Sequence, residues 1–333
     1  MGVSALAPEL SRSLRAYRRL DACVTSPAII LAVTVILVII FVAAESALAL
    51  AVFFLEGLVA LAVMAAAALA GGWLMPVLGL RDRPWHERLM IGAALGIGAL
   101  SLLTLTTGKA GLLSRPVAWI MVTIMAVLGL ARLAVDIRGS LLSQVGRGPG
   151  PDSSETPSTR RRWYLWLWLL AVPFLTIVIL AVCLPPGILW EEEAGGYDVL
   201  EYHLAVPKTF HDEGRISFLP YNVYSNFPMN SEMLSLFMMS LHGNAIGAAS
   251  MSQFANVALA ILWVAAAWLA GRFYSPRAGM VTGVLAAATP WIAYLAGIAY
   301  VEIGMLAMGM AALAALQRVE DEPSYSIRWT FVA

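Results

Sequence analysis

The chain has 333 residues, of which 60% are hydrophobic and 13% are charged, and its 21 basic and 21 acidic side chains cancel. Soluble domains are about 45–50% apolar and about 25% charged, so a chain of this length cannot bury its apolar surface in a water-soluble core. The composition excludes a soluble enzyme and a nucleic-acid binder, and it predicts an all-α polytopic membrane protein. The two cysteines, Cys23 and Cys183, provide neither a disulfide framework nor a metal-binding cysteine cluster.

Apolar stretches predict about eight membrane spans, because roughly 20 helical residues cross a bilayer. Residues 27–80 are long enough for two spans, and the other six are expected at 89–108, 116–135, 163–184, 248–271, 278–297 and 299–316.

The predicted spans fall into two groups. Residues 136–162 are rich in Gly, Pro, Ser and Thr, as linkers are. They are expected to form a cytoplasmic linker between a four-span N-terminal region, 1–135, and a second membrane module, 163–333.

Basic residues near the ends of spans predict the orientation, since lysine and arginine concentrate on the cytoplasmic side. Arginines precede the first predicted span, follow the second and fill the linker, so the N-terminus is expected in the cytoplasm as an uncleaved anchor. The first outer loop of the second module, 185–247, carries eight acidic and two basic side chains and is expected outside.

Within this loop, the sequence EMLSLFMMSL predicts a short helix that is capped by Asn230 or Ser231 and ends at Gly243. A helix of about 12 residues is roughly 18 Å long, which is too short to cross a bilayer. We therefore expect it to lie flat at the outer membrane interface.

The same loop contains a candidate chemical site. Asp198, Glu201 and Tyr202 have the i, i+3, i+4 spacing of one helical face, whereas His203 would lie about 140° from Asp198 and reach that face only from the side. Asp198 and Glu201 are equally compatible with an acidic capping box, and Tyr202 and His203 with an interfacial anchor.

A second outer carboxylate, Glu302, follows the turn between the last two predicted spans, with Tyr300 nearby. Taken alone, Glu302 is an acid near a helix N-terminus, where the helix dipole favours it. Together with Asp198 it predicts one outer cavity with the two carboxylates on the order of 10 Å apart or closer, which leaves room for a divalent metal or an acceptor hydroxyl.

This layout resembles the GT-C superfamily of integral-membrane glycosyltransferases over roughly 160–317. YDVLEYHLAVPKTFHDEGRI is similar to the opening of the first outer loop of bacterial members, and NFPMNSEMLSLFMMSLHGN to their second interfacial helix. GVLAAATPWIAYLAGIAYVEIGMLA is similar to the hairpin that follows. Since the family module continues for several more helices, the chain is expected to be C-terminally incomplete.

The resemblance implies transfer of a sugar from a polyprenyl-phosphate donor to an acceptor at the extracytoplasmic face of the inner or plasma membrane. Asp198 would be the catalytic acid, Glu302 the second acidic motif and Glu201 a supporting acid, with Mg or Mn as a possible metal between Asp198 and Glu302. The candidates for contacts with substrate or phosphate are Tyr202, His203, Lys208 and Arg215. The implied partners are the lipid-linked sugar donor and membrane lipids.

Two other functions stay open. A transporter or flippase would need polar residues along a path through the bilayer, and the predicted spans offer few. A scaffold without chemistry would use Asp198 only as a helix cap.

Overall fold

The computed structural model describes residues 51–78, 80, 83–145, 163–186 and 196–321, together with positions 32, 36 and 40. Every element within these residues is a helix, which confirms the all-α class for the described part of the chain. Four predictions fall largely or wholly outside the described residues: the first span within 27–50, most of the linker (146–162), the acidic run at 191–193 and the last segment (322–333).

Four helical stretches are long and apolar enough to cross a membrane, namely Leu55–Val77, Trp85–Lys109, Arg115–Gly139 and Ala249–Arg272. They correspond to η2 (Phe53–Gly57), α3 (Leu58–Gly71) and α4 (Leu74–Val77), then to α5 (Trp85–Lys109), α6 (Arg115–Val145) and α10 (Ala249–Arg272). These helices make the protein membrane-associated by length and composition.

The prediction of eight spans is not confirmed: the described residues hold four candidate spans, or five if a bent pair counts as one. The bent pair is α11 (Pro276–Ala287) and α12 (Pro290–Ala296), which meet at 60°. Its break follows from Pro290, which has no N–H to donate and holds Thr289 in an extended conformation, with a ψ of 119°.

The other two predicted spans are not among these candidates. The fifth becomes η3 (Trp163–Ala171), a 3₁₀ helix, and α7 (Val172–Val182), of which only Trp166–Val182 counts as an apolar helix. The last becomes α13 (Glu302–Asp321), whose uninterrupted apolar run, 303–316, is roughly 21 Å long and ends at Gln317 and Arg318.

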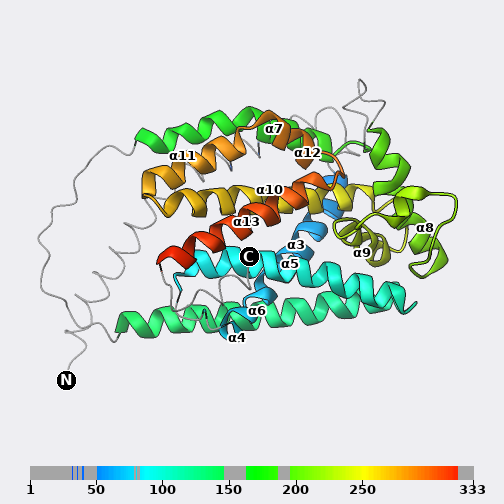
Figure 1. Cartoon of the computed structure of the whole chain (residues 1–333), viewed down its shortest axis with the longest axis horizontal. Coiled ribbons are helices and arrows are strands. Elements are labelled where there is room, and N and C mark those ends of the chain that lie inside the picture. Colours follow the sequence, from blue (N-terminus) through cyan, green and yellow to red (C-terminus); the bar gives the residue numbers. More distant parts are fainter. Residues whose placement is uncertain are drawn as a thin grey trace, which may run out of the picture.

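Helices from both sides of the linker pack together as one bundle (Figure 1). α3 packs against α5 and α6, which precede the linker, and also against α10, which follows it. α10 in turn packs against α11 and α13. The N-terminal helices therefore form part of the same core as the second module.

Ion pairs, one partly exposed and one buried, join the helices at one end of this bundle. Arg88 of α5 pairs with Asp136 of α6 at 3.1 Å, and Arg318 of α13 pairs with Glu87 of α5 at 3.5 Å. Arg318 also donates to the backbone oxygen of Leu269 on α10 at 3.2 Å. Arginines that the sequence predicts on one side of the membrane thus do lie at one end of the protein.

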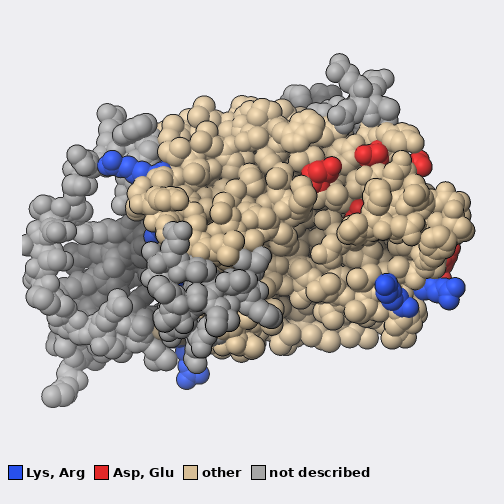
Figure 2. Space-filling model, viewed as in Figure 1, with Lys and Arg blue, Asp and Glu red and all other residues tan. Residues whose placement is uncertain are grey.

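The opposite end carries the shorter helices of the predicted outer loop, and Figure 2 shows acidic atoms gathered there on the visible face. These helices are η5 (Val199–His203), α8 (Ala205–Glu213), η6 (Val223–Asn226) and α9 (Glu232–His242). α8 packs against α9, and α9 packs against α5, α6 and α10.

α9 is the predicted short helix, and it ends as expected at Gly243, whose φ of 81° is left-handed. Every residue from Glu232 to Leu241 is buried, and the surrounding helices enclose α9. This helix therefore has no free apolar face to lay against lipid, and its interfacial position stays a prediction. The predicted cap fails: Ser231 makes no capping bond, while the Asn230 side chain accepts a hydrogen bond from Ser101 of α5 at 2.8 Å.

Candidate functional site

The turn that carries Asp198 is a π-helix, with a backbone bond from the Leu204 N–H to the Val199 oxygen at 2.9 Å. A π turn spans five residues per hydrogen bond, where an α-helix spans four. The α-helical spacing expected for Asp198, Tyr202 and His203 is therefore wrong, and the wider turn changes which side chains share a side. Such turns occur frequently at functional sites.

Asp198 does not act as a helix cap. It has helical dihedral angles, with φ −62° and ψ −32°, and its side chain makes no capping hydrogen bond. Within the described part of the chain its half-buried carboxylate has neither a hydrogen-bond partner nor an ion pair. The capping alternative for Asp198 thus has no contact to support it.

Aromatic rings from three segments gather beside this turn. The Tyr202 ring stacks on Tyr224 at 4.7 Å between centroids and meets the edge of Phe227 at 6.3 Å. On its other side, the His203 ring lies 4.0 Å from Tyr202 and 5.6 Å from Tyr300. Tyr300 belongs to the turn that leads into α13, so the rings connect the outer loop to that turn.

Two amides of α10 hold the turn before Glu302. The Asn256 amide donates to the backbone oxygens of Ile298 and Tyr300, both at 2.7 Å. The Gln253 amide donates to the Gly297 oxygen at 3.1 Å. Both side chains are buried. Glu302 itself is exposed in the first turn of α13, so its stabilisation by the helix dipole remains an alternative to a chemical role.

The negative charges of Asp198 and Glu302 both affect the pKa of the Tyr202 hydroxyl. Burial, together with the negative charges of Asp198, Glu302 and Glu232, raises the pKa of Tyr202 from 10.0 to about 12. The Tyr202 hydroxyl therefore stays protonated at neutral pH and faces a negative potential. The carboxylates predicted to converge thus lie close enough to influence one side chain.

His203 forms a buried pair that the sequence did not reveal. Its Nδ1 lies 2.9 Å from Oε1 of Glu232, the first residue of α9, and the two side chains are 2% and 4% exposed. The remaining polar atoms of the pair, Nε2 of His203 and Oε2 of Glu232, are buried without a partner in the described structure. The only sequence signal for Glu232 was an acid at a helix start, which the helix dipole already explains.

We call these residues the aromatic–acidic cluster: Asp198, Tyr202, His203, Tyr224, Phe227, Glu232, Tyr300 and Glu302. The remaining predicted site residues lie elsewhere. Glu201 is exposed and contributes its backbone oxygen to the Asn222 amide at 3.2 Å. Lys208 is half exposed and pairs with Asp212 at 2.6 Å within α8.

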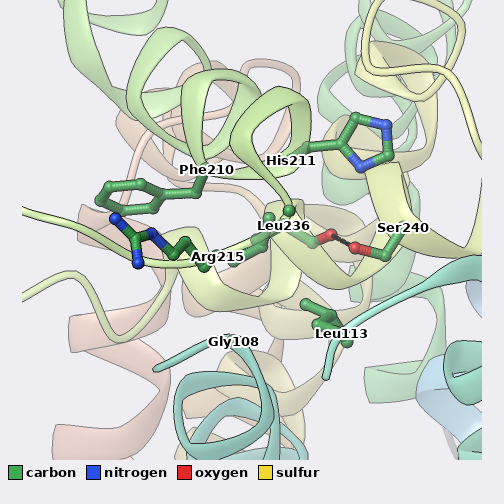
Figure 3. A pocket seen from close by; sticks show the side chains of 8 residues that line it. Gly108, Leu113, Phe210, His211, Arg215, Leu236 and Ser240 are labelled. Atoms are coloured by element: carbon green, nitrogen blue, oxygen red, sulfur yellow. Dashed lines mark hydrogen bonds between the residues drawn. The ribbon is translucent and has the colours of Figure 1, made fainter. Parts of the chain in front are cut away.

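Arg215 lies beside a small pocket of about 10 Å³, room for one water at most, between α8, α9 and the end of α5. Figure 3 shows Arg215 and His211 around this pocket with Leu236, Ser240 and Gly108, and the hydrogen bond from the Ser240 hydroxyl to the Leu236 oxygen. No hydrogen bond or ion pair among the described residues joins Lys208 or Arg215 to the cluster. Of the candidate cations, the structure brings only His203 to it.

The residues do not form a multidentate metal site. In the described part of the chain, no three His, Cys, Asp or Glu side chains gather closely enough to hold a metal ion. A metal between Asp198 and Glu302 would therefore take its remaining ligands from outside these side chains, and we derive no step through one.

A larger cavity, of about 470 Å³, lies between α3, α5 and α10 and contains none of the predicted site residues. Its lining is almost entirely apolar, including Met64, Leu89 and Ile261. Because these three helices are candidate membrane spans, the cavity suits the hydrocarbon chain of a membrane lipid.

Compared with known proteins, the chain matches no family model, no curated protein sequence and no solved structure.

Proposed function

We propose that the protein is a membrane glycosyltransferase that moves a sugar from a polyprenyl-phosphate donor to an acceptor at the extracytoplasmic face of the membrane. The observation that carries this proposal is Asp198, a half-buried carboxylate without a capping bond or an ion pair that shares the surroundings of Tyr202 with Glu302. Carboxylates can orient or deprotonate an acceptor hydroxyl, and the flat faces of aromatic rings suit the apolar faces of sugars.

The position of the cluster supports the same proposal. It lies where candidate membrane helices end, at the end of the bundle opposite the Arg88–Asp136 and Arg318–Glu87 ion pairs (Figure 1). A lipid-linked sugar keeps its chain in the bilayer and its anomeric carbon at headgroup level. A site for that carbon belongs at the end of a membrane helix, as here.

The test supplies polyprenyl-phosphate mannose or polyprenyl-phosphate glucose, each with a radioactive sugar, to right-side-out membrane vesicles that contain the protein. The radioactivity that remains in the lipid-linked fraction is then measured. We expect one of the two sugars to leave the lipid-linked fraction, and Asp198→Asn to slow this at least about 100-fold without loss of protein. Glu213→Gln, which changes an exposed acid of α8, is the matched control and should keep the wild-type rate.

Two outcomes would contradict the proposal. If vesicles with wild-type protein retain both labels as vesicles without it do, the protein is not a transferase for these donors. If Asp198→Asn lowers abundance in proportion to activity, Asp198 has the scaffold role.

A further inference from the structure

We infer that His203, oriented by Glu232, is the proton acceptor of this site and that the acceptor substrate is therefore a hydroxyl compound. The inference rests on the proposed function and gives the base role to His203 where the sequence suggested Asp198. It starts from the two buried polar atoms that have no partner, Nε2 of His203 and Oε2 of Glu232.

A buried polar pair with unsatisfied atoms is unfavourable for stability alone. Leaving a buried donor or acceptor without a partner costs about 1–3 kcal/mol. Such groups in a folded protein call for a functional explanation. Here the π turn directs His203 inward toward Glu232, which lies 29 residues later in the chain.

The geometry fixes which nitrogen is free. Glu232 Oε1 lies 2.9 Å from Nδ1. We therefore assign the ring proton to Nδ1, which donates a hydrogen bond to the carboxylate. The neutral imidazole then has its lone pair on Nε2, the arrangement in which a carboxylate orients a histidine base and stabilises the imidazolium that forms.

The surroundings favour the protonated product. The titratable side chains that contact the imidazole are Glu232 on α9, Tyr202 on its own turn and Tyr300 before α13. The Glu232 carboxylate stabilises a positive charge on the ring, and the negative charges of Asp198 and Glu302 act on the neighbouring Tyr202. The same charges disfavour a negatively charged acceptor, so a neutral hydroxyl fits the site better.

Nε2 is enclosed in the unliganded protein, where Tyr202 and Tyr300 flank the ring at 4.0 and 5.6 Å. Both tyrosines are only half-buried, and an acceptor that binds Nε2 must displace a side chain that covers it. Catalytic contacts often form only when substrate binds.

Sugar transfer exchanges one bond of the anomeric carbon for another. The bond between the anomeric carbon and the phosphate oxygen breaks, and its electron pair leaves with the phosphate. The acceptor oxygen bonds to the anomeric carbon, and its proton moves to Nε2 of His203. The imidazolium later returns this proton to water.

The test uses His203→Asn, Glu232→Gln and the control His211→Gln in the vesicle assay, with the sugar that the wild-type protein consumes. Asparagine keeps an N–H near the position of Nδ1, so Glu232 retains its donor while Nε2 is lost. We expect His203→Asn to accumulate normally and to slow label release by roughly 100-fold or more, whereas His211→Gln keeps the wild-type rate.

The pH dependence separates a base from a structural residue. Glu232→Gln removes the charge that stabilises imidazolium, so the acid limb of the rate profile should move to lower pH while the plateau rate falls. If His203→Asn or Glu232→Gln is active with an unchanged acid limb, while Asp198→Asn is inactive, the inference is wrong and the proposed function stands. If the wild-type protein consumes neither donor, the proposed function fails and the inference fails with it.

Discussion

Tyr202 shows at the scale of single residues how the site combines burial and charge. Burial and, to a smaller extent, three carboxylates from different segments raise its pKa to about 12. The phenol keeps its proton more firmly in the folded protein than in the unfolded chain. Its contribution to stability is complete below pH 10 and is lost as the pH rises toward 12.

This gives a test of the convergence of Asp198 and Glu302 that does not depend on activity. The difference in tyrosinate absorbance between the wild type and Tyr202→Phe isolates the titration of Tyr202. We expect Asp198→Asn and Glu302→Gln each to move that titration to lower pH, because each removes a negative charge. Glu213→Gln is the control and should leave it unchanged. If Glu302→Gln leaves the titration of Tyr202 unchanged, the two acids lie in separate environments.

The sequence showed the individual chemical groups better than their partners. Asp198, Tyr202, His203 and Glu302 were all recognisable as residue types at the outer face. The pairing of His203 with Glu232 was not, because it depends on how α9 packs. The roles expected for Lys208 and Arg215 at the site have no contact to support them, since one pairs within α8 and the other lies beside the end of α5.

At the scale of elements, α3 and α5 pack closely because small residues line their contact. A Cβ placed on Gly96 would overlap the backbone oxygen of Ala67, and one on Gly92 would lie 3.1 Å from the Cα of Gly72. Gly92 and Gly96 form a GxxxG pattern, which allows membrane helices to approach each other.

Gly96→Ala should therefore destabilise the protein by about 1–3 kcal/mol, because the obstacle is backbone that cannot move aside. Gly98 lies on the same helix, and a Cβ there meets no atom within 4 Å. Gly98→Ala should be neutral or stabilise by up to about 1 kcal/mol. Unfolding in detergent at increasing temperature measures both variants, and equal effects would contradict this packing.

The turn before α13 is held by hydrogen bonds from α10. Asn256→Leu removes the donor from two backbone oxygens, at an expected cost of about 1–3 kcal/mol for each group left unsatisfied. We expect faster hydrogen exchange at the backbone amides of 299–304 and slower sugar transfer, while α11 keeps its protection.

Ser252→Ala serves as the control for Asn256→Leu. Ser252 is also buried on α10, but its hydroxyl bonds only to Ala248 of the same helix. Protection of 299–304 should persist in this variant. Equal exchange in both variants would mean that Asn256 does not hold the turn.

Local sequence predicted the ends of some helices but neither their burial nor their exact helix type. The start and end of α9 followed from a polar segment, an apolar run and Gly243. Its burial did not, because α5, α6, α8 and α10 cover it, and these contacts join distant parts of the sequence. The π turn at η5 was missed because nothing in the residues from Val199 to His203 distinguishes it from an α-helical turn.

At the scale of the whole molecule, composition alone predicted a helical membrane protein, and the described helices agree. The number of spans did not follow, because hydropathy could not show that α11 and α12 meet at 60° at Pro290. Nor could sequence show that α3 packs on α10, which makes the N-terminal helices part of one bundle.

The central claim is that Asp198 and Glu302 share one site on the outer side of the membrane. Cysteine labelling in intact cells tests it, on a background in which Cys23 and Cys183 are replaced by alanine. The reporters are Tyr197→Cys, beside Asp198, and Glu302→Cys, with Arg277→Cys at the opposite end as the control; all three positions are exposed. We predict that a membrane-impermeant maleimide labels positions 197 and 302 from outside, and position 277 only after the membrane is permeabilised. Labelling of 197 or 302 only after permeabilisation would contradict the claim.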